Sequence, residues 1–337
     1  RTRTRRRTLR IATYNILLGA ERREGLVESV LHRIDADVIA LQEVTHTDLA
    51  RRLAAAFDMQ LMLGEPSDPA SPHTALLSRL PVLEWRNQRH PGRMLRSHLH
   101  CRLDTGSAAL PALGVHCVHL AARFGERAKG EARRLRELTA VFGDMRQERS
   151  QPHLVVGDFN ALSPGDPLAA TQFFQRMSAL RRAGVIGTRS DGLVGPINRQ
   201  DWSPEDVDSA WLAAGIDPRL EGSIPVLPRV VGPLTGSLPV HAGVDRLLGR
   251  FIERWTVERM QTEGYVDCFR QMHPRAKGFT CATWSPAARI DYAFATREVA
   301  ELVSRCDVVG GRGWPDPDAA VASDHFPLVI DFAFPSR

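Results

Sequence analysis

The chain of 337 residues contains few cysteines and no long apolar run. Its five cysteines are odd in number and include no CxxC pair, which disfavours a disulfide framework and a cysteine-bound zinc site. We therefore expect them to be mostly buried free thiols. No stretch of about 18 apolar residues occurs, so no membrane span is expected. With 43% apolar and 25% charged residues, the composition is that of a globular protein and disfavours a disordered or collagen-like chain.

Outside the N-terminus the chain also has almost no net charge. The chain has 44 Lys and Arg against 39 Asp and Glu, but six of the arginines lie within the first ten residues, and without them the balance is 38 against 39. The whole-chain charge therefore does not require a basic nucleic-acid-binding face. We expect residues 1–8 to form a flexible Arg-rich tail, with an arm for nucleic acid or acidic lipid as the alternative.

The compartment and the oligomeric state are not determined by the sequence. The N-terminal arginines are not followed by the apolar segment of a signal peptide, which favours a cytoplasmic location. The sequence also lacks an initiator methionine, so a removed leader stays open.

Short apolar runs alternate with helical patterns through most of the chain. Residues 164–264 differ, because helical patterns and dense prolines and glycines replace the strands. We predict that this segment is an insertion over one rim of a single domain spanning residues 9–337. Within it, Ser203 before Pro204 is typical of a helix N-terminus. Residues 242–262 are expected to form one helix, and residues 215–239 a long ordered loop.

The most informative pattern is a polar residue at the end of an apolar run, which recurs along the chain. The residues concerned are Asn15, Glu43, His119, Asp158, Asn160, Asp291, Asp324 and His325. Side chains two apart on a strand share a face, so Asp158 and Asn160 are expected to point into one pocket. Carboxylates and amides are hard oxygen ligands, and such a cysteine-poor set suits Mg²⁺ or Mn²⁺ rather than Zn²⁺.

Each of these residues alone has an ordinary structural explanation. An Asp or Asn at a strand end usually serves turn chemistry. A lone histidine such as His119 is more often a core residue with satisfied hydrogen bonds, and Asp291 alone is explained as a partner of Arg289. What distinguishes the set is the local sequence around its members, taken in chain order.

Seven short motifs carry a resemblance to a known family. They are Thr13-Tyr14-Asn15-Ile16, Leu41-Gln42-Glu43-Val44, Leu76-Leu77-Ser78-Arg79-Leu80-Pro81, Val118-His119-Leu120, Gly157-Asp158-Phe159-Asn160-Ala161, Arg289-Ile290-Asp291-Tyr292 and Ser323-Asp324-His325-Phe326-Pro327-Leu328. In this order they resemble the endonuclease/exonuclease/phosphatase superfamily, the deoxyribonuclease-I-like phosphoesterases. The GDxN and SDH motifs are the most specific of the seven.

The resemblance implies an α/β (α+β) fold, a four-layer α/β/β/α sandwich of two packed mixed β-sheets flanked by helices. The site is expected at one edge, where strand ends from both sheets meet. Glu43 resembles the principal metal carboxylate, with Asn15 beside it, and Asp324 resembles a second carboxylate on the metal side. The implied cofactor is Mg²⁺ or Mn²⁺.

The resemblance also assigns catalytic roles. Asp158 resembles the residue that orients or deprotonates the attacking water, and Asn160 a contact to phosphate and metal. His325 resembles the phosphate-contacting histidine, held by Asp291. His119 resembles a second histidine found in the deoxyribonuclease and sphingomyelinase branches, which contacts phosphate or assists the leaving group; we prefer it to the neighbouring His116 because Leu120 fits the motif.

The expected activity is divalent-metal-dependent hydrolysis of a phosphodiester, or a phosphomonoester, by in-line attack of an activated water. The substrate stays open between DNA or RNA, for an endo- or exonuclease, and a phospholipid, for a sphingomyelin-type phosphodiesterase. A lipid enzyme needs an exposed apolar rim, for which Trp202 and Trp211 are candidates. Val156 before the GDxN motif, and Arg289-Ile290-Asp291 in place of Cys-Asp-Arg, disfavour an inositol polyphosphate phosphatase. The alternative of another class is a non-catalytic interaction module on the same fold.

Overall fold

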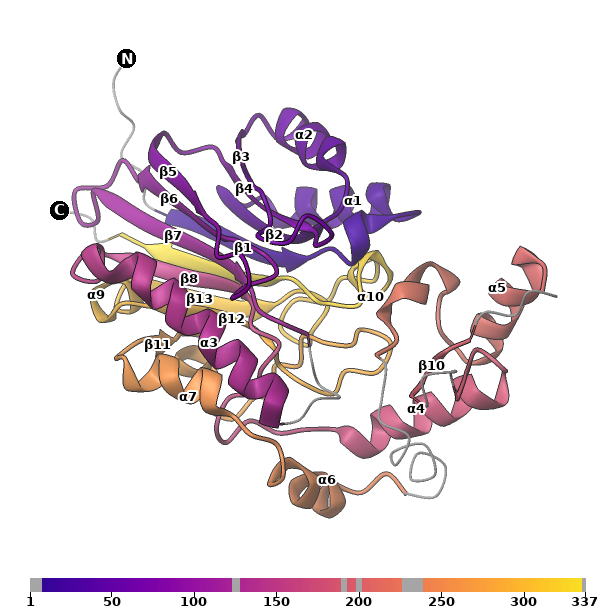
Figure 1. Cartoon of the computed structure of the whole chain (residues 1–337). Coiled ribbons are helices and arrows are strands. Elements are labelled where there is room, and N and C mark those ends of the chain that lie inside the picture. Colours follow the sequence, from indigo (N-terminus) through magenta and orange to yellow (C-terminus); the bar gives the residue numbers. More distant parts are fainter. Residues whose placement is uncertain (1–7, 123–127, 189–192, 198–201, 226–238, 335–337) are drawn as a thin grey trace.

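The computed structural model describes residues 8–122, 128–188, 193–197, 202–225 and 239–334. Two six-stranded mixed sheets pack against each other, and helices cover their outer faces (Figure 1). The predicted four-layer sandwich is therefore confirmed. The expected tail lies outside the described residues, apart from Thr8, which begins the first strand. Much of the expected loop at 215–239 also lies outside them.

The first sheet joins the start and the end of the chain. Its strand order is β13 (Val303–Val308), β14 (Leu328–Ala333), β1 (Thr8–Asn15), β2 (Val38–Val44), β4 (His73–Ser78) and β3 (Gln60–Gly64). β1 pairs parallel with β2 and antiparallel with β14. Because β1 is central and buried, its polar C-terminal residue is held at a defined edge of the sheet.

The second sheet is built from the middle of the chain. Its strand order is β11 (Val266–Asp267), β12 (Asp291–Ala295), β8 (His153–Asp158), β7 (Ala112–His119), β6 (His98–Asp104) and β5 (Val82–Gln88). β7 and β8 are parallel and end together, with His119 opposite Asp158. β12 runs the other way and begins with Asp291 opposite Asp158.

Apolar residues every three or four positions give each outer helix one buried face. α1 (Glu24–Ile34) and α2 (Thr47–Ala56) bury Val27, Leu31 and Leu53 against the core of the first sheet. α3 (Ala128–Asp144) and α7 (Trp255–Thr262) pack together over the second sheet. The remaining short elements near the sandwich are η1 (Leu18–Ala20), η3 (Met145–Gln147), α8 (Cys268–Met272), α9 (Arg297–Ala300) and α10 (Ala319–Ala322).

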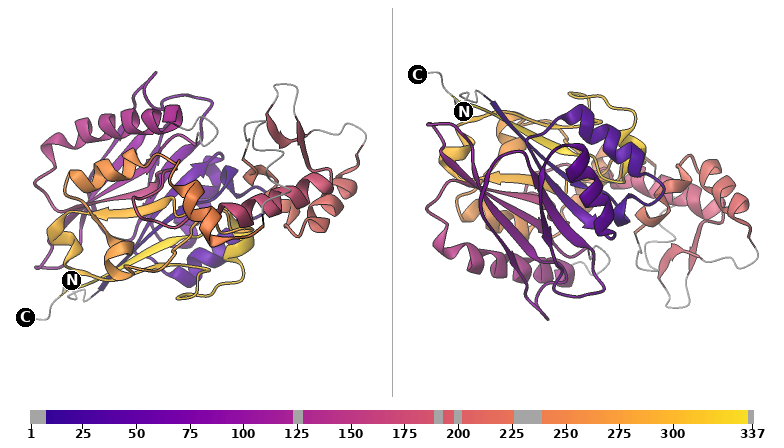
Figure 2. Two further views of the ribbon diagram at one scale, coloured as in Figure 1. Left: turned by 90° about the horizontal axis from the view of Figure 1, so that it is seen from below. Right: turned by 90° about the horizontal axis from the view of Figure 1, so that it is seen from above.

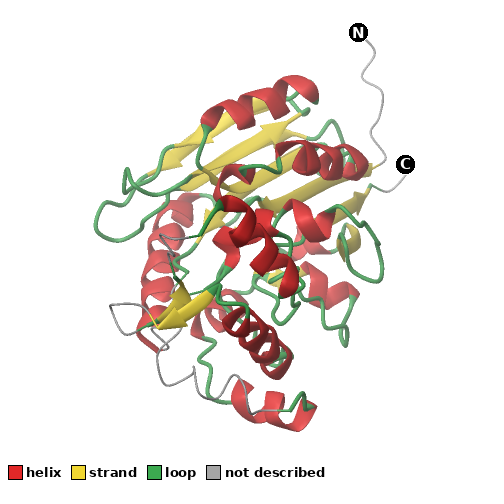
Figure 3. Ribbon diagram, turned by 90° about the vertical axis from the view of Figure 1, so that its right-hand side faces the viewer, coloured by secondary structure: helices red, strands yellow, loops and turns green. Residues whose placement is uncertain are grey.

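The segment predicted as an insertion contains helices and a two-stranded sheet, and it supplies most of an apolar cluster that Leu17 also joins. Its elements are α4 (Ala170–Arg182), β9 (Ile186–Thr188), β10 (Val194–Pro196), α5 (Pro204–Ala213), η4 (Pro218–Ser223) and α6 (Ala242–Gly249). α4, α5 and β10 project from one end of the sandwich (Figures 1 and 2), and Figure 3 shows the two-stranded sheet apart from the large sheets. α5 begins as predicted, with Ser203 and Asp206 forming a reciprocal capping box. Trp211 is buried in the local cluster and therefore cannot form the apolar rim suggested for it.

The single helix predicted over residues 242–262 is wrong. The structure has two helices, α6 and α7, separated at residues 250–254. The Arg254 side chain donates to the carbonyl oxygens of Ser163 and Asp166 and so ties the break to the start of the insertion. α7 then buries Val257 and Met260, whereas α6 buries no residue. Tertiary contacts have overridden a continuous helical pattern.

All five cysteines are free, and four are buried, as expected; Cys281 is partly exposed. Across the described ranges, no helix is both long and apolar enough to cross a membrane.

Candidate active site

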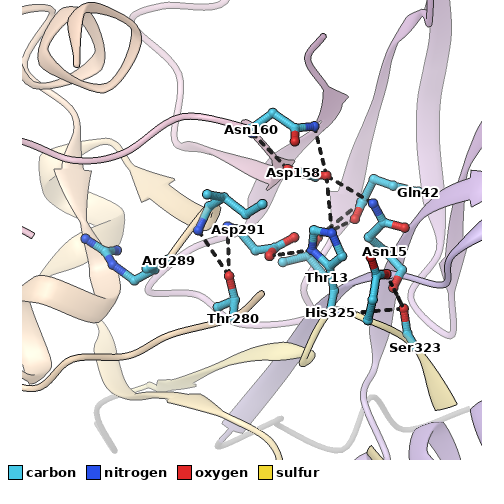
Figure 4. Close-up of polar contacts among 12 residues, drawn as sticks. Thr13, Asn15, Gln42, Asp158, Asn160, Thr280, Arg289, Asp291, Ser323 and His325 are labelled. Atoms are coloured by element: carbon cyan, nitrogen blue, oxygen red, sulfur yellow. Dashed lines mark hydrogen bonds and ion pairs between the residues drawn. The ribbon is translucent and has the colours of Figure 1, made fainter. Parts of the chain in front are cut away.

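Strand ends from both sheets meet at one edge of the sandwich and bring the polar residues together (Figure 4). The parallel strands β1 and β2 end near Asn15 and Glu43, and the parallel strands β7 and β8 end at His119 and Asp158. Parallel neighbours in one sheet present their carboxyl ends at the same edge, which explains why residues distant in sequence converge here.

Asp158 is buried at the centre of this site and receives three N–H donors. Its Oδ1 accepts from the backbone N–H of Asn160 at 2.8 Å, and its Oδ2 accepts from the amides of Asn15 at 3.0 Å and Asn160 at 3.1 Å. Burial raises the pKa of Asp158 to about 7, despite the opposing positive charge of His325. The carboxyl group is thus tuned close to neutral pH.

Asp158 and Asn160 do converge, but not by strand alternation as predicted. β8 ends at Asp158, and Asn160 follows in a turn with a left-handed φ of 49°. The turn carries the Asn160 amide back over the Asp158 carboxylate and lets it also donate to the Leu120 carbonyl at 3.0 Å. Asn tolerates this conformation better than most side chains do.

Glu43 lies where β2 departs from regular pairing, between Leu41 and Val44. Its φ of 62° is left-handed and sets the carboxylate apart from the strand. Glu43 Oε1 accepts from the Asn15 amide at 3.1 Å, and Oε2 accepts from the Leu18 N–H at 2.9 Å. Asn15 therefore bridges Glu43 and Asp158 from a fixed position.

His325 pairs with Asp291 across the site. The distance from His325 Nδ1 to Asp291 Oδ2 is 2.8 Å, and Nε2 lies 3.8 Å from Asp158 Oδ2. Burial lowers the pKa of His325, but the negative charges around it, led by Asp291, raise the pKa by more than burial lowers it. The pKa therefore lies well above its usual value. The ring is therefore an imidazolium at neutral pH. Thr280 fixes the start of β12 because its Oγ1 accepts from the backbone N–H of Asp291 at 3.2 Å.

His119 is 1% exposed, and neither ring nitrogen has a hydrogen-bond partner among the described residues. Its Nε2 lies 3.4 Å from Asp158 Oδ2 and 3.9 Å from Glu43 Oε1. Burial lowers its pKa well below the usual value, so the ring is neutral. A buried polar group without a partner costs roughly 1–3 kcal/mol, which makes a bound ligand the natural source of the missing contact.

Asp324 completes the acidic side of the site. It lies between Ser323 and His325 in the loop before β14, and burial raises its pKa to about 6. Ser323 holds this loop in place, because its Oγ donates to the Asn15 carbonyl at 2.7 Å and accepts from the His325 N–H at 3.2 Å. Asp324 and His325 each present a ligand atom within 4.8 Å of the other.

The structure thus brings all eight predicted residues into one site. The alternative that Asp291 is a partner of Arg289 is wrong, because Arg289 pairs with Asp166 and Asp267 instead. His116, the alternative to His119, lies outside the site. Sequence reasoning missed the supporting roles of Ser323 and Thr280. Ser323 stands inside the SDH motif, but no local signal indicates Thr280.

The donor set of the site suits a hard divalent cation. Glu43 and Asp324 are carboxylates, and Asn15 supplies an amide. Cys281 Sγ lies within 4.8 Å of ligand atoms of Asp324 and His325, but burial raises the pKa of its thiol to about 12, so it is not a thiolate ligand at neutral pH. Two of the carboxyl groups, Asp158 and Asp324, have raised pKa values because burial disfavours their charge. A bound cation would offset that penalty directly. The residues therefore fit a Mg²⁺ or Mn²⁺ ion.

Comparisons with known proteins agree with this architecture. A model of the Endonuclease/Exonuclease/phosphatase family matches residues 12–325. No curated protein sequence matches the chain. Among solved structures, an AP endonuclease from Archaeoglobus fulgidus is 13% identical with a TM-score of 0.56, over 96% of this chain and 99% of its own. The 3'-5' exonuclease NExo from Neisseria meningitidis is 15% identical with a TM-score of 0.54, over 97% and 100%.

The human nocturnin catalytic domain with a bound sulfate anion is similar in the same way, with 16% identity and a TM-score of 0.53 over 98% of this chain and 95% of its own. At these identities the likeness shows the fold alone. The family model is independent of it and spans the chain from the first strand to the SDH motif. The chain therefore belongs to the endonuclease/exonuclease/phosphatase family, whose members hydrolyse phosphoester bonds.

Proposed function

We propose that the protein is a Mg²⁺-dependent phosphodiesterase that hydrolyses its substrate by in-line attack of water. The observation that carries the proposal is the arrangement around Asp158. A buried carboxylate with a pKa of about 7 faces one charged and one neutral imidazole, His325 and His119, and lies beside Glu43. In this set Asp158 is the proposed base, His325 is a positively charged hydrogen-bond donor, and His119 is a neutral donor without a hydrogen-bond partner among the described residues.

Asp158 is the proposed base. Its pKa of about 7 leaves a large ionised fraction at neutral pH while keeping enough basicity to take a proton from water. The three N–H donors from Asn15 and Asn160 hold the carboxylate in one orientation. In-line attack needs such a fixed direction, because misplacement of the nucleophile by about 1 Å costs roughly 100-fold in rate.

The two histidines have different proposed tasks. His325, kept positive by Asp291, donates from Nε2 to a phosphoryl oxygen and stabilises charge that grows in the transition state. His119 is neutral and has one N–H to offer to phosphate or to the leaving oxygen. His119 matches the second histidine of the deoxyribonuclease and sphingomyelinase branches, both of which cleave diesters, and this resemblance favours a diester over a monoester.

Glu43, Asn15 and Asp324 are the proposed residues that hold the cation. Bound there, Mg²⁺ or Mn²⁺ would supply Lewis-acid stabilisation of the phosphoryl and leaving oxygens. The Leu18 N–H and the Asn15 amide hold the Glu43 carboxylate in position. Such supporting contacts commonly change metal affinity by roughly 10–100-fold.

Metal dependence gives a direct prediction. Chelation should abolish activity, and Mg²⁺ should restore it. Glu43→Gln should raise the Mg²⁺ concentration for half-maximal activity by at least roughly 10-fold, since an amide is a weaker ligand than a carboxylate. Titration of initial rate against Mg²⁺ measures this. Glu84→Gln, on the exposed part of β5, is the control, and an unchanged Mg²⁺ requirement in Glu43→Gln would contradict the assignment.

A pH prediction follows from the pKa of Asp158. The base must be ionised, so kcat/KM should fall about tenfold per pH unit below the pKa of Asp158, which is about 7 without the cation and is lowered when the cation is bound. Activity should hold above pH 7 until His325 loses its proton, because the pKa of that residue is raised well above its usual value by the charge of Asp291, which outweighs burial. A pH–rate profile at saturating Mg²⁺ measures this, and an activity that rises on acidification would exclude Asp158 as the base.

The substrate is tested by a panel with Mg²⁺: plasmid DNA, abasic DNA, RNA, sphingomyelin vesicles, inositol phosphates and bis-p-nitrophenyl phosphate. A nucleic acid is the first candidate, because two similar structures are described as an AP endonuclease and a 3'-5' exonuclease. Nicking or degradation that disappears in Asp158→Asn supports it. Silence across the panel together with no Mg²⁺ binding would leave the interaction module.

A lipid phosphodiester is the second candidate, on account of exposed apolar side chains near the break between α6 and α7. Leu247, Phe251 and Trp255 are 53%, 63% and 42% exposed. These three large apolar side chains are exposed and lie within nine residues of one another in the sequence. Such exposed apolar groups favour contact with an apolar partner such as a membrane surface. Turnover of sphingomyelin vesicles that falls in Phe251→Ser, without loss of turnover of bis-p-nitrophenyl phosphate, would support this candidate.

A further inference from the structure

A second group of polar residues lies on the outer face of the second sheet, away from the candidate active site. Leu99, Cys101, Val115 and Cys117 point into the core between the two sheets. The alternating positions on β6 and β7 therefore face the other way, and they hold His98, His100 and His116. His153 at the start of the neighbouring strand β8 joins them, because its ring meets His116 edge-on at 5.2 Å.

Three side chains of this group aim their ligand atoms at one point. His100 Nε2 lies 3.3 Å from Glu148 Oε2, and His116 Nε2 lies 3.8 Å from the same oxygen. All three ligand atoms are within 4.8 Å of one another. In a tetrahedral zinc site with bonds of 2.0–2.2 Å, ligand atoms are separated by roughly 3.3–3.5 Å. The two distances to Glu148 Oε2 are thus close to the spacing that zinc requires.

His116 Nε2 has no partner in the part of the chain that the structure describes, although the residue is 1% exposed. Its other nitrogen, Nδ1, lies 2.9 Å from His98 Nε2, and His98 Nδ1 lies 2.9 Å from Asp144 Oδ2. When His98 Nδ1–H donates a hydrogen bond to the Asp144 carboxylate, His98 Nε2 is left to accept from His116 Nδ1–H, and this tautomer assignment satisfies both contacts. This series of hydrogen bonds leaves a lone pair on His116 Nε2, the nitrogen that lies 3.8 Å from Glu148 Oε2.

The surroundings hold the Glu148 carboxylate and place a glycine beside His100. Arg86 Nη1 lies 3.3 Å from Glu148 Oε1, which fixes one carboxylate oxygen while Oε2 faces the histidines. Gly114 lies beside them, and a Cβ at this position would come within 3.4 Å of His100 Nε2. The hydrogen-bonded chain from His116 through His98 to Asp144 is the outer-shell arrangement that commonly orients metal-bound histidines.

We propose that His100, His116 and Glu148 form a Zn²⁺ site on the outer face of the second sheet, with a water molecule as the fourth ligand. Imidazole nitrogens favour zinc over Mg²⁺, which separates this site from the oxygen-rich candidate active site. The ion would join β6 and β7 to the segment that follows α3 and η3, and its role would be structural. The proposal is independent of the proposed hydrolytic function.

The test is Zn²⁺ binding by the full-length chain, freed of metal by a chelator and then held in excess Mg²⁺ to occupy the active site. We expect one Zn²⁺ per chain, measured by elemental analysis after gel filtration. Affinity comes from competition with a chromophoric chelator. Glu148→Gln and His116→Gln should weaken Zn²⁺ binding by at least roughly 100-fold. Co²⁺ should give the intense visible absorption of a four-coordinate site, and this absorption should disappear in both variants.

Two matched controls separate this site from its neighbours. His153→Gln removes a histidine from the same face whose nitrogens are engaged by Gln151 and Tyr265, at 2.7 Å each, and it should keep the ion. Asp324→Asn alters the candidate active site and should also keep it. Glu148 is partly exposed, so its variant tests the site even if His116→Gln fails to fold. Zn²⁺ retained in Glu148→Gln, lost in Asp324→Asn, or absent from the native chain would overturn the proposal.

Discussion

His325→Ala should lower kcat by roughly 10³–10⁴-fold while leaving the fold intact. The variant removes the imidazolium that is paired with Asp291 at 2.8 Å and proposed to stabilise the transition state. It also removes the positive charge nearest to Asp158, which opposes the effect of burial on that pKa. Both losses fall on the chemical step, so kcat should drop far more than KM changes. Steady-state kinetics on the active panel substrate measure the effect.

The chain offers a matched control for this prediction. His273 Nε2 also lies 2.8 Å from a carboxylate, Asp307 Oδ1, but outside the site. His273→Ala should keep nearly full activity, because its pair stabilises only the loop around it. Equal losses in the two variants would mean that His325 acts through folding rather than catalysis, and thermal unfolding curves of both proteins would show it.

Arg289→Met should destabilise the protein by about 3–5 kcal/mol, the largest effect on stability that we expect. Arg289 is 0% exposed and binds two buried carboxylates. Its Nε donates to Asp166 at 2.8 Å, and its two terminal nitrogens donate to Asp267 at 3.0 and 2.7 Å. Removing one member of a buried ion network leaves the others charged without a partner. Denaturant midpoints and thermal unfolding measure the loss.

Removal of the unpaired charges should reverse much of this loss. Adding Asp267→Asn to Arg289→Met neutralises the carboxylate that loses both of its Arg289 contacts, so the double variant should be more stable than the single one. Arg270→Met is the control, because Arg270 contacts Asp166 at 2.8 Å from a partly exposed position. It should cost at most about 1 kcal/mol. A loss of stability in Arg270→Met as large as that in Arg289→Met would show that burial of the arginine does not determine the free energy of unfolding that it contributes.

The Arg289 network also links stability to the site. Asp166 lies near the start of the predicted insertion, Asp267 ends β11, and Arg289 stands two residues before Asp291. The network therefore anchors the segment that leads into β12 and into Asp291, the carboxylate that pairs with His325. A conservative Arg289→Lys variant, which cannot bind both carboxylates in the same forked geometry, is expected to lose stability and to lower kcat through displacement of Asp291.

The sequence by itself determined the family, the order of the motifs and the residue types of the site. Each motif joins an apolar run to a polar residue. This pattern is local, because the apolar run forms a buried strand and the polar residue lies at the end of that strand. The same local character explains the successful prediction of α5, whose Ser203 and Pro204 mark a helix start without help from distant contacts. The expected Mg²⁺ and the catalytic roles stay predictions.

Only the tertiary structure decided which distant residues meet. It gave the physical reason for the preference for His119, because side chains three apart on a strand point to opposite sides, which puts His119 in the site and His116 among the histidines on the other face. It brought Asp291 within 2.8 Å of His325, the pairing that the resemblance implies, and it gave Arg289 to Asp166 and Asp267 rather than to Asp291. It also split the predicted helix at residues 250–254. The periodicity of apolar residues reflects only interactions between residues that are close in sequence. These pairings depend instead on how the two sheets pack against each other, which no local sequence pattern specifies.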